Sequence, residues 1–260
     1  MNDREKSLEE FNRLLDIIDE LRQKCPWDMK QTNESLRKLT IEETYELAES
    51  IFSGSDAGIK NELGDIMLHI VFYAKIGSEK GAFTMTDVLE GINKKLIYRH
   101  PHVFGDVKVA GASEVEENWE QLKIKEDKGY KPVLSGVPAS LPAIIKANRI
   151  QEKVRGVGFD WEKREQIWDK VMEELSELKV EIDNHNTESI ESELGDVLFS
   201  IINASRLYGI DPEAALEKTN RKFIKRFNFL ENETLKKGKS LHDMSLDEMN
   251  VIWEDAKKQD

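Results

Sequence analysis

The sequence has little of what several fold classes require. Its 260 residues include a single cysteine, Cys25, which excludes a disulfide framework and a cysteine-based metal cluster. Six prolines and fifteen glycines are few for this length and argue against a turn-rich β-sandwich. The most apolar stretches, 66–76 and 197–202, are too short or too interrupted to span a bilayer. These absences predict an all-α protein that has no membrane partner.

Positive charge is also scarce. The chain has 38 Lys and Arg against 51 Asp and Glu, giving a net charge of −13. Broad nucleic-acid binding needs a basic surface, so no direct nucleic-acid binding is expected. Small phosphorylated ligands remain possible, because a bound metal ion inverts the local field. The N-terminal stretch MNDREKSLEEF is charged and lacks the apolar core of a signal peptide, which together with the lone cysteine predicts a cytoplasmic location.

Apolar residues recur at helical spacing along most of the chain. Leu8, Phe11, Leu15 and Ile18 predict an opening helix of about five turns, which Pro26 ends. The stretch GYKPVLSGVPASLP holds three of the six prolines and is typical of a linker. We therefore predict an N-terminal helical domain over 1–128, a linker over 129–142 and a C-terminal domain over 143–260. The further predicted helices cover 41–51, 59–80, 86–98, 113–127, 144–154, 166–182, 187–208, 212–235 and 245–258.

The sequence contains an internal repeat. EETYELAESIFSGSDAGIKNELGD (42–65) and EELSELKVEIDNHNTESIESELGD (173–196) are both 24 residues long and share ten identical positions. INKKLIYR (92–99) likewise matches TNRKFIKR (219–226), and NWEQLK (118–123) matches IWEDAK (252–257). A period this long indicates a duplicated domain rather than a solenoid array.

Each copy of the repeat holds four acids, two on each of two consecutive predicted helices. Acids three residues apart share one helix face, so two antiparallel helices bring all four together. Oxygen ligands suit Mg²⁺ or Mn²⁺ and suit Zn²⁺ poorly. A di-iron site is excluded because no histidine follows a glutamate by three residues. We call these sets the first quartet (Glu43, Glu46, Glu62, Asp65) and the second quartet (Glu174, Glu177, Glu193, Asp196).

A solvated acidic face is the plain alternative for either quartet. Against it, both copies end in Glu-Leu-Gly-Asp inside an apolar helix, where glycine costs about 1 kcal/mol relative to alanine. Finding this glycine twice predicts a close approach there by a backbone or a ligand. Crowded like charges are also costly to desolvate unless a cation binds them.

Cations recur at matching places too. Lys222 and Arg226 lie one helical turn apart, as do Lys95 and Arg99, and either pair is a candidate for phosphate binding or an ordinary solvated stripe. Trp253 and Lys257 are candidates for contact with a base and a phosphate, with a core tryptophan as the alternative.

Four stretches resemble the MazG family of nucleoside triphosphate pyrophosphohydrolases: CPWDMKQTNESLRKLTIEETYELAESI (25–51), YRHPHVFGD (98–106), NWEQLK and GVGFDW. The resemblance covers nearly the whole chain, including the two-domain layout. It implies two tandem helical bundles of the all-α NTP pyrophosphohydrolase type, a homodimer, and Mg²⁺-dependent cleavage of nucleoside triphosphates to NMP and pyrophosphate. It also implies a role in clearing surplus or non-canonical nucleotides, with a link to the stringent response in bacteria.

The resemblance assigns metal binding and catalysis to the second quartet, with the C-terminal domain as the principal catalyst. It assigns substrate binding to Lys170, Lys222, Arg226, Trp253 and Lys257. The first half keeps its acids, Lys95, Arg99, Trp119 and Lys123, but Leu39 stands where Lys170 stands in the second half. This difference weakens the case for a fully active N-terminal site. The rival functional reading is a non-catalytic nucleotide-sensing or partner-binding helical module.

Overall fold

The computed structural model describes residues 2–111, 114–115, 118–119, 122 and 132–259, and every regular element in these residues is a helix. The all-α prediction is therefore confirmed. The helix predicted over 113–127 lies largely outside the described residues, and Lys123 lies wholly outside them. None of the described helices is both long enough and apolar enough to cross a membrane.

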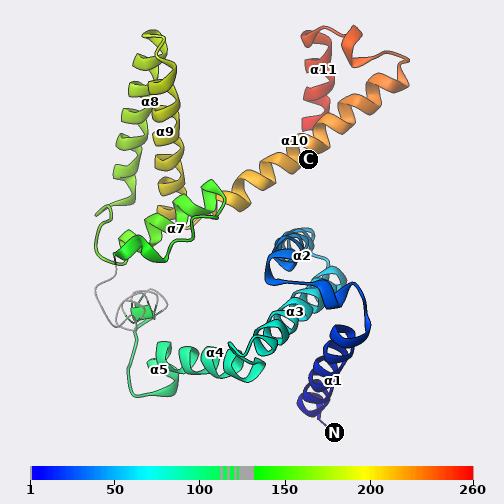
Figure 1. Cartoon of the computed structure of the whole chain (residues 1–260). Helices are drawn as coiled ribbons and strands as arrows, with labels where there is room; N and C mark the ends of the chain where they lie inside the picture. Colours follow the sequence, from blue (N-terminus) through cyan, green and yellow to red (C-terminus); the bar gives the residue numbers. More distant parts are fainter. Residues whose placement is uncertain (1, 112–113, 116–117, 120–121, 123–131, 260) are drawn as a thin grey trace. The chain divides into compact units, whose positions relative to one another are not determined.

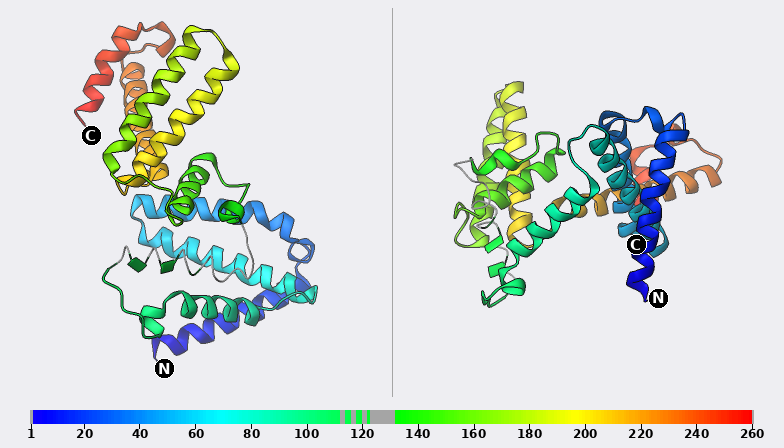
Figure 2. Two further views of the ribbon diagram at one scale, coloured as in Figure 1. Left: turned by 90° about the vertical axis from the view of Figure 1, so that its left-hand side faces the viewer. Right: turned by 60° about the horizontal axis from the view of Figure 1, so that its bottom comes forward.

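The chain divides into two compact units, Met1–Val109 and Ala110–Asp260, each described here by itself. The domain and linker boundaries near 128 and 142 stay predictions. The first unit contains α1 (Asp3–Lys24), α2 (Asn33–Ser53), α3 (Asp56–Glu79), α4 (Met85–Arg99) and the short α5 (Pro101–Phe104). In this unit α2 and α3 lie side by side, with α1 and α4 also packed on α3 (Figure 1 and Figure 2).

Local capping sets the start of two of these helices. Asn2 caps α1 through a capping box with Glu5, and the helix ends before Pro26 as predicted. The prediction for α2 was wrong at its start: the helix begins at Asn33 rather than near residue 41, because Thr32 and Ser35 form a second capping box. This extra length buries Leu36 in a core shared by α1, α2 and α3 (Ile18, Leu36, Val71, Phe72, Ile76).

The second unit contains α7 (Ala143–Arg155), α8 (Ile167–Asp183), α9 (Thr187–Leu207), α10 (Pro212–Lys236) and α11 (Leu246–Lys257), all close to their predicted ranges. Helices α8 and α9 form a long hairpin, and α10 and α11 form a second pair. Helix α10 leaves the base of the hairpin near α7 and leads away from it, as Figure 1 shows in green, yellow and orange.

The two acid-bearing hairpins, α2–α3 and α8–α9, turn in the same way. Gly54 adopts a left-handed φ of 70°, and His185, its counterpart in the repeat, adopts 57°. The next residue then caps the second helix: Ser55 accepts from the Gly58 N–H at 3.1 Å, and Asn186 accepts from the Ser189 N–H at 3.4 Å. The repeated backbone geometry thus joins the two acid-bearing helices of each unit by the same kind of turn.

Candidate active site

The first quartet converges across α2 and α3. Carboxylate oxygens of Glu43, Glu62 and Asp65 all lie within 4.8 Å of one another, whereas Glu46 is not part of that cluster. Loss of hydration, followed by the negative charges of Asp65, Glu46 and Glu62, raises the pKa of Glu43. The side chains are therefore close enough to repel one another.

The second quartet converges across α8 and α9. Oxygens of Glu174, Glu177 and Glu193 lie within 4.8 Å of one another, and Glu174 is only 7% exposed. Loss of hydration and the charges of Glu177 and Asp196 raise the pKa of Glu193. Asp196 is not part of the three-residue cluster, but it lines a cavity together with Glu174.

Lys170 supplies one positive charge to the second quartet. Its Nζ lies 2.8 Å from Glu174 Oε1 and 3.1 Å from Glu173 Oε1. These hydrogen bonds, the one with Glu174 first, raise the pKa of Lys170 above its ordinary value. In the first unit the counterpart, Leu39, packs against the apolar core instead. The two quartets thus differ in their local counter-charge.

The donor chemistry fits a hard divalent cation. Three carboxylates from two helices present oxygen atoms at close range in each unit, and a single lysine cannot balance the charge of the second set. Geometry of this kind disfavours the alternative in which the acids point separately into solvent. Metal binding by either quartet stays a prediction.

The sequence predicted that a backbone or a ligand comes close to the glycine of each Glu-Leu-Gly-Asp, and the first of these alternatives is wrong. A Cβ built on Gly64 or on Gly195 meets nothing within 4 Å in the described chain, so no neighbouring segment comes close at either place. The surrounding side chains Leu63, Leu194 and Leu198 are about half exposed, at 53%, 48% and 55%. The open side of each glycine is therefore accessible to a ligand or to another molecule.

The predicted substrate-binding residues of α10 and α11 lie apart from the second quartet within one chain. Trp253 packs on Phe223 with ring centroids 5.1 Å apart, and Lys257 pairs with Glu254. Helix α10 packs on α7 and α11 and touches α9 less extensively, while the cavity beside Glu174 is lined by none of Lys222, Arg226, Trp253 and Lys257. Of the predicted substrate contacts, only Lys170 lies beside the second quartet.

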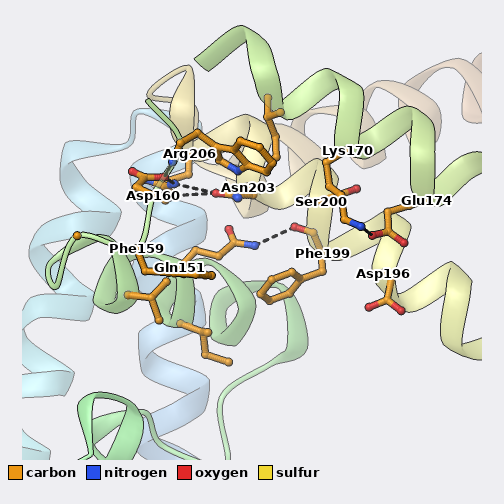
Figure 3. A pocket seen from close by; sticks show the side chains of 15 residues that line it. Gln151, Phe159, Asp160, Lys170, Glu174, Asp196, Phe199, Ser200, Asn203 and Arg206 are labelled. Atoms are coloured by element: carbon orange, nitrogen blue, oxygen red, sulfur yellow. Dashed lines mark hydrogen bonds and ion pairs between the residues drawn. The ribbon is translucent and has the colours of Figure 1, made fainter. Parts of the chain in front are cut away.

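A cavity of about 530 Å³ opens beside the second quartet (Figure 3). Lys170, Glu174 and Asp196 lie at one end, and residues of α7, the GVGFDW segment and α9 form the rest. The sequence interpretation assigned no role to several of these residues, among them Gln151 and Asn203. A polar side chain such as Asn203 inside the apolar helix stretch DVLFSIINASRLY was the available signal.

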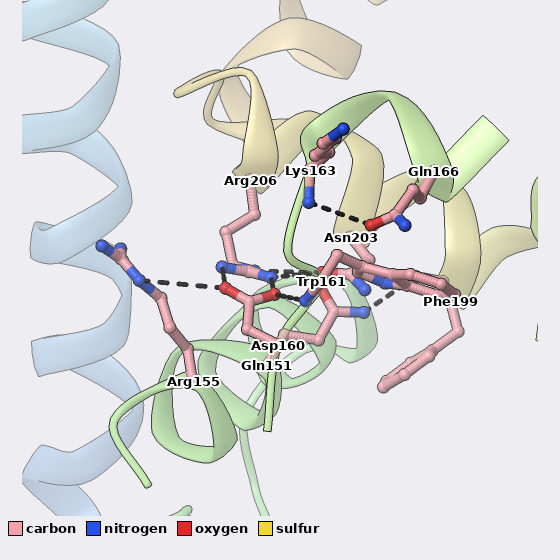
Figure 4. Close-up of polar contacts among 9 residues, drawn as sticks. All are labelled: Gln151, Arg155, Asp160, Trp161, Lys163, Gln166, Phe199, Asn203 and Arg206. Atoms are coloured by element: carbon pink, nitrogen blue, oxygen red, sulfur yellow. Dashed lines mark hydrogen bonds and ion pairs between the residues drawn. The ribbon is translucent and has the colours of Figure 1, made fainter. Parts of the chain in front are cut away.

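One wall of this cavity is held by the ion pair of Asp160 and Arg206 (Figure 4). The Arg206 guanidinium donates to both Asp160 oxygens, one at 3.0 Å, and Arg206 Nε also donates to Asn203 Oδ1 at 3.0 Å. The Trp161 N–H donates to Asp160 Oδ1 at 2.9 Å. Burial alone raises the pKa of Asp160, but the hydrogen bonds from Arg206 and the Trp161 N–H outweigh it and leave that pKa below its ordinary value.

Comparison with known proteins finds the MazG nucleotide pyrophosphohydrolase domain at residues 31–104 and 162–229. The chain is 44% identical over 251 residues to the nucleoside triphosphate pyrophosphohydrolase/pyrophosphatase MazG of Thermotoga maritima, covering 95% of both chains. It is 37% identical over 260 residues to the nucleoside triphosphate pyrophosphohydrolase of Escherichia coli K12, covering 97% of this chain and 99% of that one. It is also 44% identical to YabN of Bacillus subtilis, of which it spans 52%.

Proposed function

Because this chain belongs to the MazG family, we propose that it is a nucleoside triphosphate pyrophosphohydrolase that depends on Mg²⁺, with Mn²⁺ as a substitute. The reaction cleaves the bond between the α and β phosphates and gives NMP and pyrophosphate. The observation that carries the proposal is the close approach of Glu174, Glu177 and Glu193 beside a cavity large enough for part of a nucleotide. Its cellular role is clearance of surplus nucleotides in the cytoplasm, with a link to the stringent response.

The second quartet would hold the cation, which supplies charge neutralisation for the triphosphate and activates water. Lys170, beside Glu174, is placed to donate hydrogen bonds to phosphate oxygens. A quartet carboxylate accepts the proton of the attacking water, and the water oxygen bonds to phosphorus as the pyrophosphate leaves. Apolar lining residues such as Ile150, Val154 and Ile167 would shield the bound substrate from part of the solvent and strengthen these electrostatic contacts.

Product identification tests this proposal. The full chain is incubated with ATP, the other NTPs and dNTPs in Mg²⁺, and the products are separated by ion-exchange chromatography. AMP and pyrophosphate are expected from ATP. ADP and orthophosphate would contradict α–β cleavage, and ATP binding without turnover would favour a nucleotide sensor.

A Glu177→Ala variant tests the role of the quartet. Turnover should fall to background while the circular dichroism spectrum stays unchanged, because Glu177 is exposed and its removal leaves no cavity in the core. Glu188→Ala, on the first turn of α9 and outside the quartet, is the matched control and should keep full activity. Wild-type turnover by Glu177→Ala would refute catalysis at this quartet.

We also propose a homodimer that completes the site. Phe223 and Ile224 on α10 are 56% and 57% exposed, and Leu198 on α9 is 55% exposed, which leaves apolar helix faces uncovered in one chain. In the proposed dimer, α10 and α11 of one copy bring Lys222, Arg226, Trp253 and Lys257 to the second quartet of the other. This arrangement accounts for the separation of these residues within a single chain.

Complementation between variants tests the shared site. Glu177→Ala and Arg226→Ala proteins are each inactive if both groups are required. Unfolded together and refolded as a one-to-one mixture, they should recover about a quarter of the wild-type rate, because half the dimers are mixed and each has one intact site. No recovery, or a monomer by sedimentation, would refute the shared site.

A further inference from the structure

The cavity beside the second quartet contains a buried polar group that no side chain or backbone group of the described residues satisfies. Gln151 on α7 is only 3% exposed and lines the cavity (Figure 3). Its Nε2 donates to the Phe199 carbonyl at 2.8 Å, whereas its Oε1 has no hydrogen-bond partner among the residues that the structure describes. Buried acceptors are nearly always satisfied in folded proteins, so a ligand that donates here would remove a real cost.

The orientation of this amide is determined. A backbone carbonyl can only accept a hydrogen bond, so the amide nitrogen must face Phe199. Flipping the amide would place two oxygen atoms against each other. The hydrogen bond to Phe199 thus fixes the amide, and Oε1 keeps its position as an unsatisfied acceptor.

The rest of the cavity suits a flat, neutral ligand. Asn203 Oδ1 is occupied by Arg206, which leaves its amide N–H groups as donors in the same cavity as Gln151. Three aromatic residues, Phe159, Trp161 and Phe199, line the cavity and are 80%, 39% and 41% exposed. Asp160 and Arg206, the charged lining residues away from the acids, pair with each other, and Arg155 approaches Asp160 Oδ2 to 3.9 Å from outside the lining. That end of the cavity therefore presents a ligand with paired rather than unpaired charges.

The first unit fills the corresponding place. Phe72 lies seven residues after the last acid of the first quartet, as Asn203 lies seven residues after the last acid of the second. Phe72 is 2% exposed and belongs to the apolar core of α1, α2 and α3. The position that carries an amide in the second unit is therefore occupied by a buried apolar residue in the first, which also has Leu39 in place of Lys170.

We propose that this cavity receives the nucleobase of the substrate, and that Gln151 Oε1 accepts a hydrogen bond from an N–H on the Watson–Crick edge of the base. The proposal rests on the proposed function and adds how the substrate is recognised. Adenine and cytosine offer an exocyclic amine, guanine an amine and a ring N–H, and uracil and thymine a ring N–H. One fixed acceptor thus accommodates every common base and disfavours a base without an N–H donor.

Purine riboside triphosphate provides the test, because its base lacks the amine of ATP and has no ring N–H. The full chain in Mg²⁺ should show kcat/KM for ATP roughly ten- to a hundredfold above that for purine riboside triphosphate, mainly through KM, because the analogue leaves the acceptor unpaired. Gln151→Met removes the acceptor and should bring the two substrates to within about threefold. Asn148→Met is the matched control and should keep the wild-type ratio, because Asn148 lies on the same helix, pairs with Glu152 and does not line the cavity.

Binding of the monophosphates separates failure of this inference from failure of the proposed function. Calorimetric titration of wild type with AMP and with purine riboside monophosphate should show the same preference without any turnover. Absence of hydrolysis together with this preference would refute the proposed function and support the base site. Equal use and equal binding of both nucleotides by wild type would overturn the base site, even if Gln151→Met failed to fold. A preference that persists in a folded Gln151→Met protein would overturn the role of Gln151.

Discussion

The ion pair of Asp160 and Arg206 should stabilise the second unit measurably, and Arg206→Met is the perturbation that removes it. Methionine keeps much of the apolar stem and deletes the guanidinium. In the wild type the Arg206 side chain is 9% exposed and that of Asp160 is 20% exposed, so the pair is largely but not fully buried. Breaking a buried pair costs about 3–5 kcal/mol, and solvent access to Asp160 lowers the expected loss to about 2–3 kcal/mol.

A double-mutant cycle isolates the pair from the lost packing. Asp160→Asn leaves the Arg206 charge without its carboxylate and should cost about 2 kcal/mol by itself. Combined with Arg206→Met, the total should fall short of the sum by about 1–2 kcal/mol, because the second change removes the charge that the first left unpaired. Lys179→Met is the control: its partner Asp183 is 65% exposed, so the change should be under about 0.5 kcal/mol.

Acid should reduce the effect of Arg206→Met. The pKa of Asp160 in the folded state lies below its ordinary value of 3.8, so this group stabilises the fold fully above that pH. The contribution is lost as pH falls through the lower folded pKa, where the carboxyl group becomes neutral. Urea unfolding followed by circular dichroism is compared at pH 7 and at pH 3. Arg206→Met as stable as wild type at pH 7, or an undiminished difference in acid, would refute the reasoning.

Three further predictions concern the turns, a cap and the cation. Gly54→Ala should lower the free energy of unfolding by about 1 kcal/mol, because a Cβ there meets no neighbouring atom but the φ of 70° is unfavourable for alanine. His185→Ala is the control: that position already carries a side chain, so the free energy of unfolding should change by less than about 0.5 kcal/mol in the same urea assay. Hydrogen bonds from the Ser245 N–H and from Lys239 lower the pKa of Glu248 to about 2. In thermal melting at a series of pH values, the wild type should therefore be more stable than Glu248→Gln above pH 4.5, and this difference should vanish near pH 2. A difference that does not change with pH would contradict this. Mn²⁺ at about 100 times its Kd should raise the unfolding free energy by about 2.7 kcal/mol, and Glu174→Gln should reduce this gain in calorimetry; an equal gain in both proteins would argue against the second quartet as the site.

The quartets were predictable because their signal is local and repeated. Acids at i and i+3 on two consecutive helices must share faces, and two copies of the same spacing exclude coincidence. The starts of α1 and α11 are set by caps at Asn2 and Ser245, whose partners lie three residues away and are therefore visible in the sequence, whereas the cap at Thr32 was missed and the start of α2 was predicted too late. Which three acids of each quartet approach most closely was not predictable, since the clusters differ: Asp65 belongs to the first, whereas Glu177 belongs to the second.

The cavity beside the second quartet could not be inferred from the sequence, because it depends on pairs of residues that are distant along the chain. Gln151 is fixed by a carbonyl 48 residues further along the chain, and Arg206 reaches an aspartate 46 residues earlier. Neither pair leaves a pattern in spacing. The direction of α10 is likewise a tertiary property, and residues assigned to one site by resemblance, such as Lys222, therefore lie on a helix that leads away from the acids.

Phe72 and Asn203 show two fates of one position after duplication. The first unit, which fills this position with a buried apolar residue, can lose its chemistry and keep its fold. The second unit has a cavity here, and its packing is complete only when a ligand is bound. For the second unit, the nucleotide would act as the last piece of the core as well as the substrate. In the nucleotide-free protein the two units should then melt at different temperatures, and a tightly bound product should raise the melting temperature of the second unit alone.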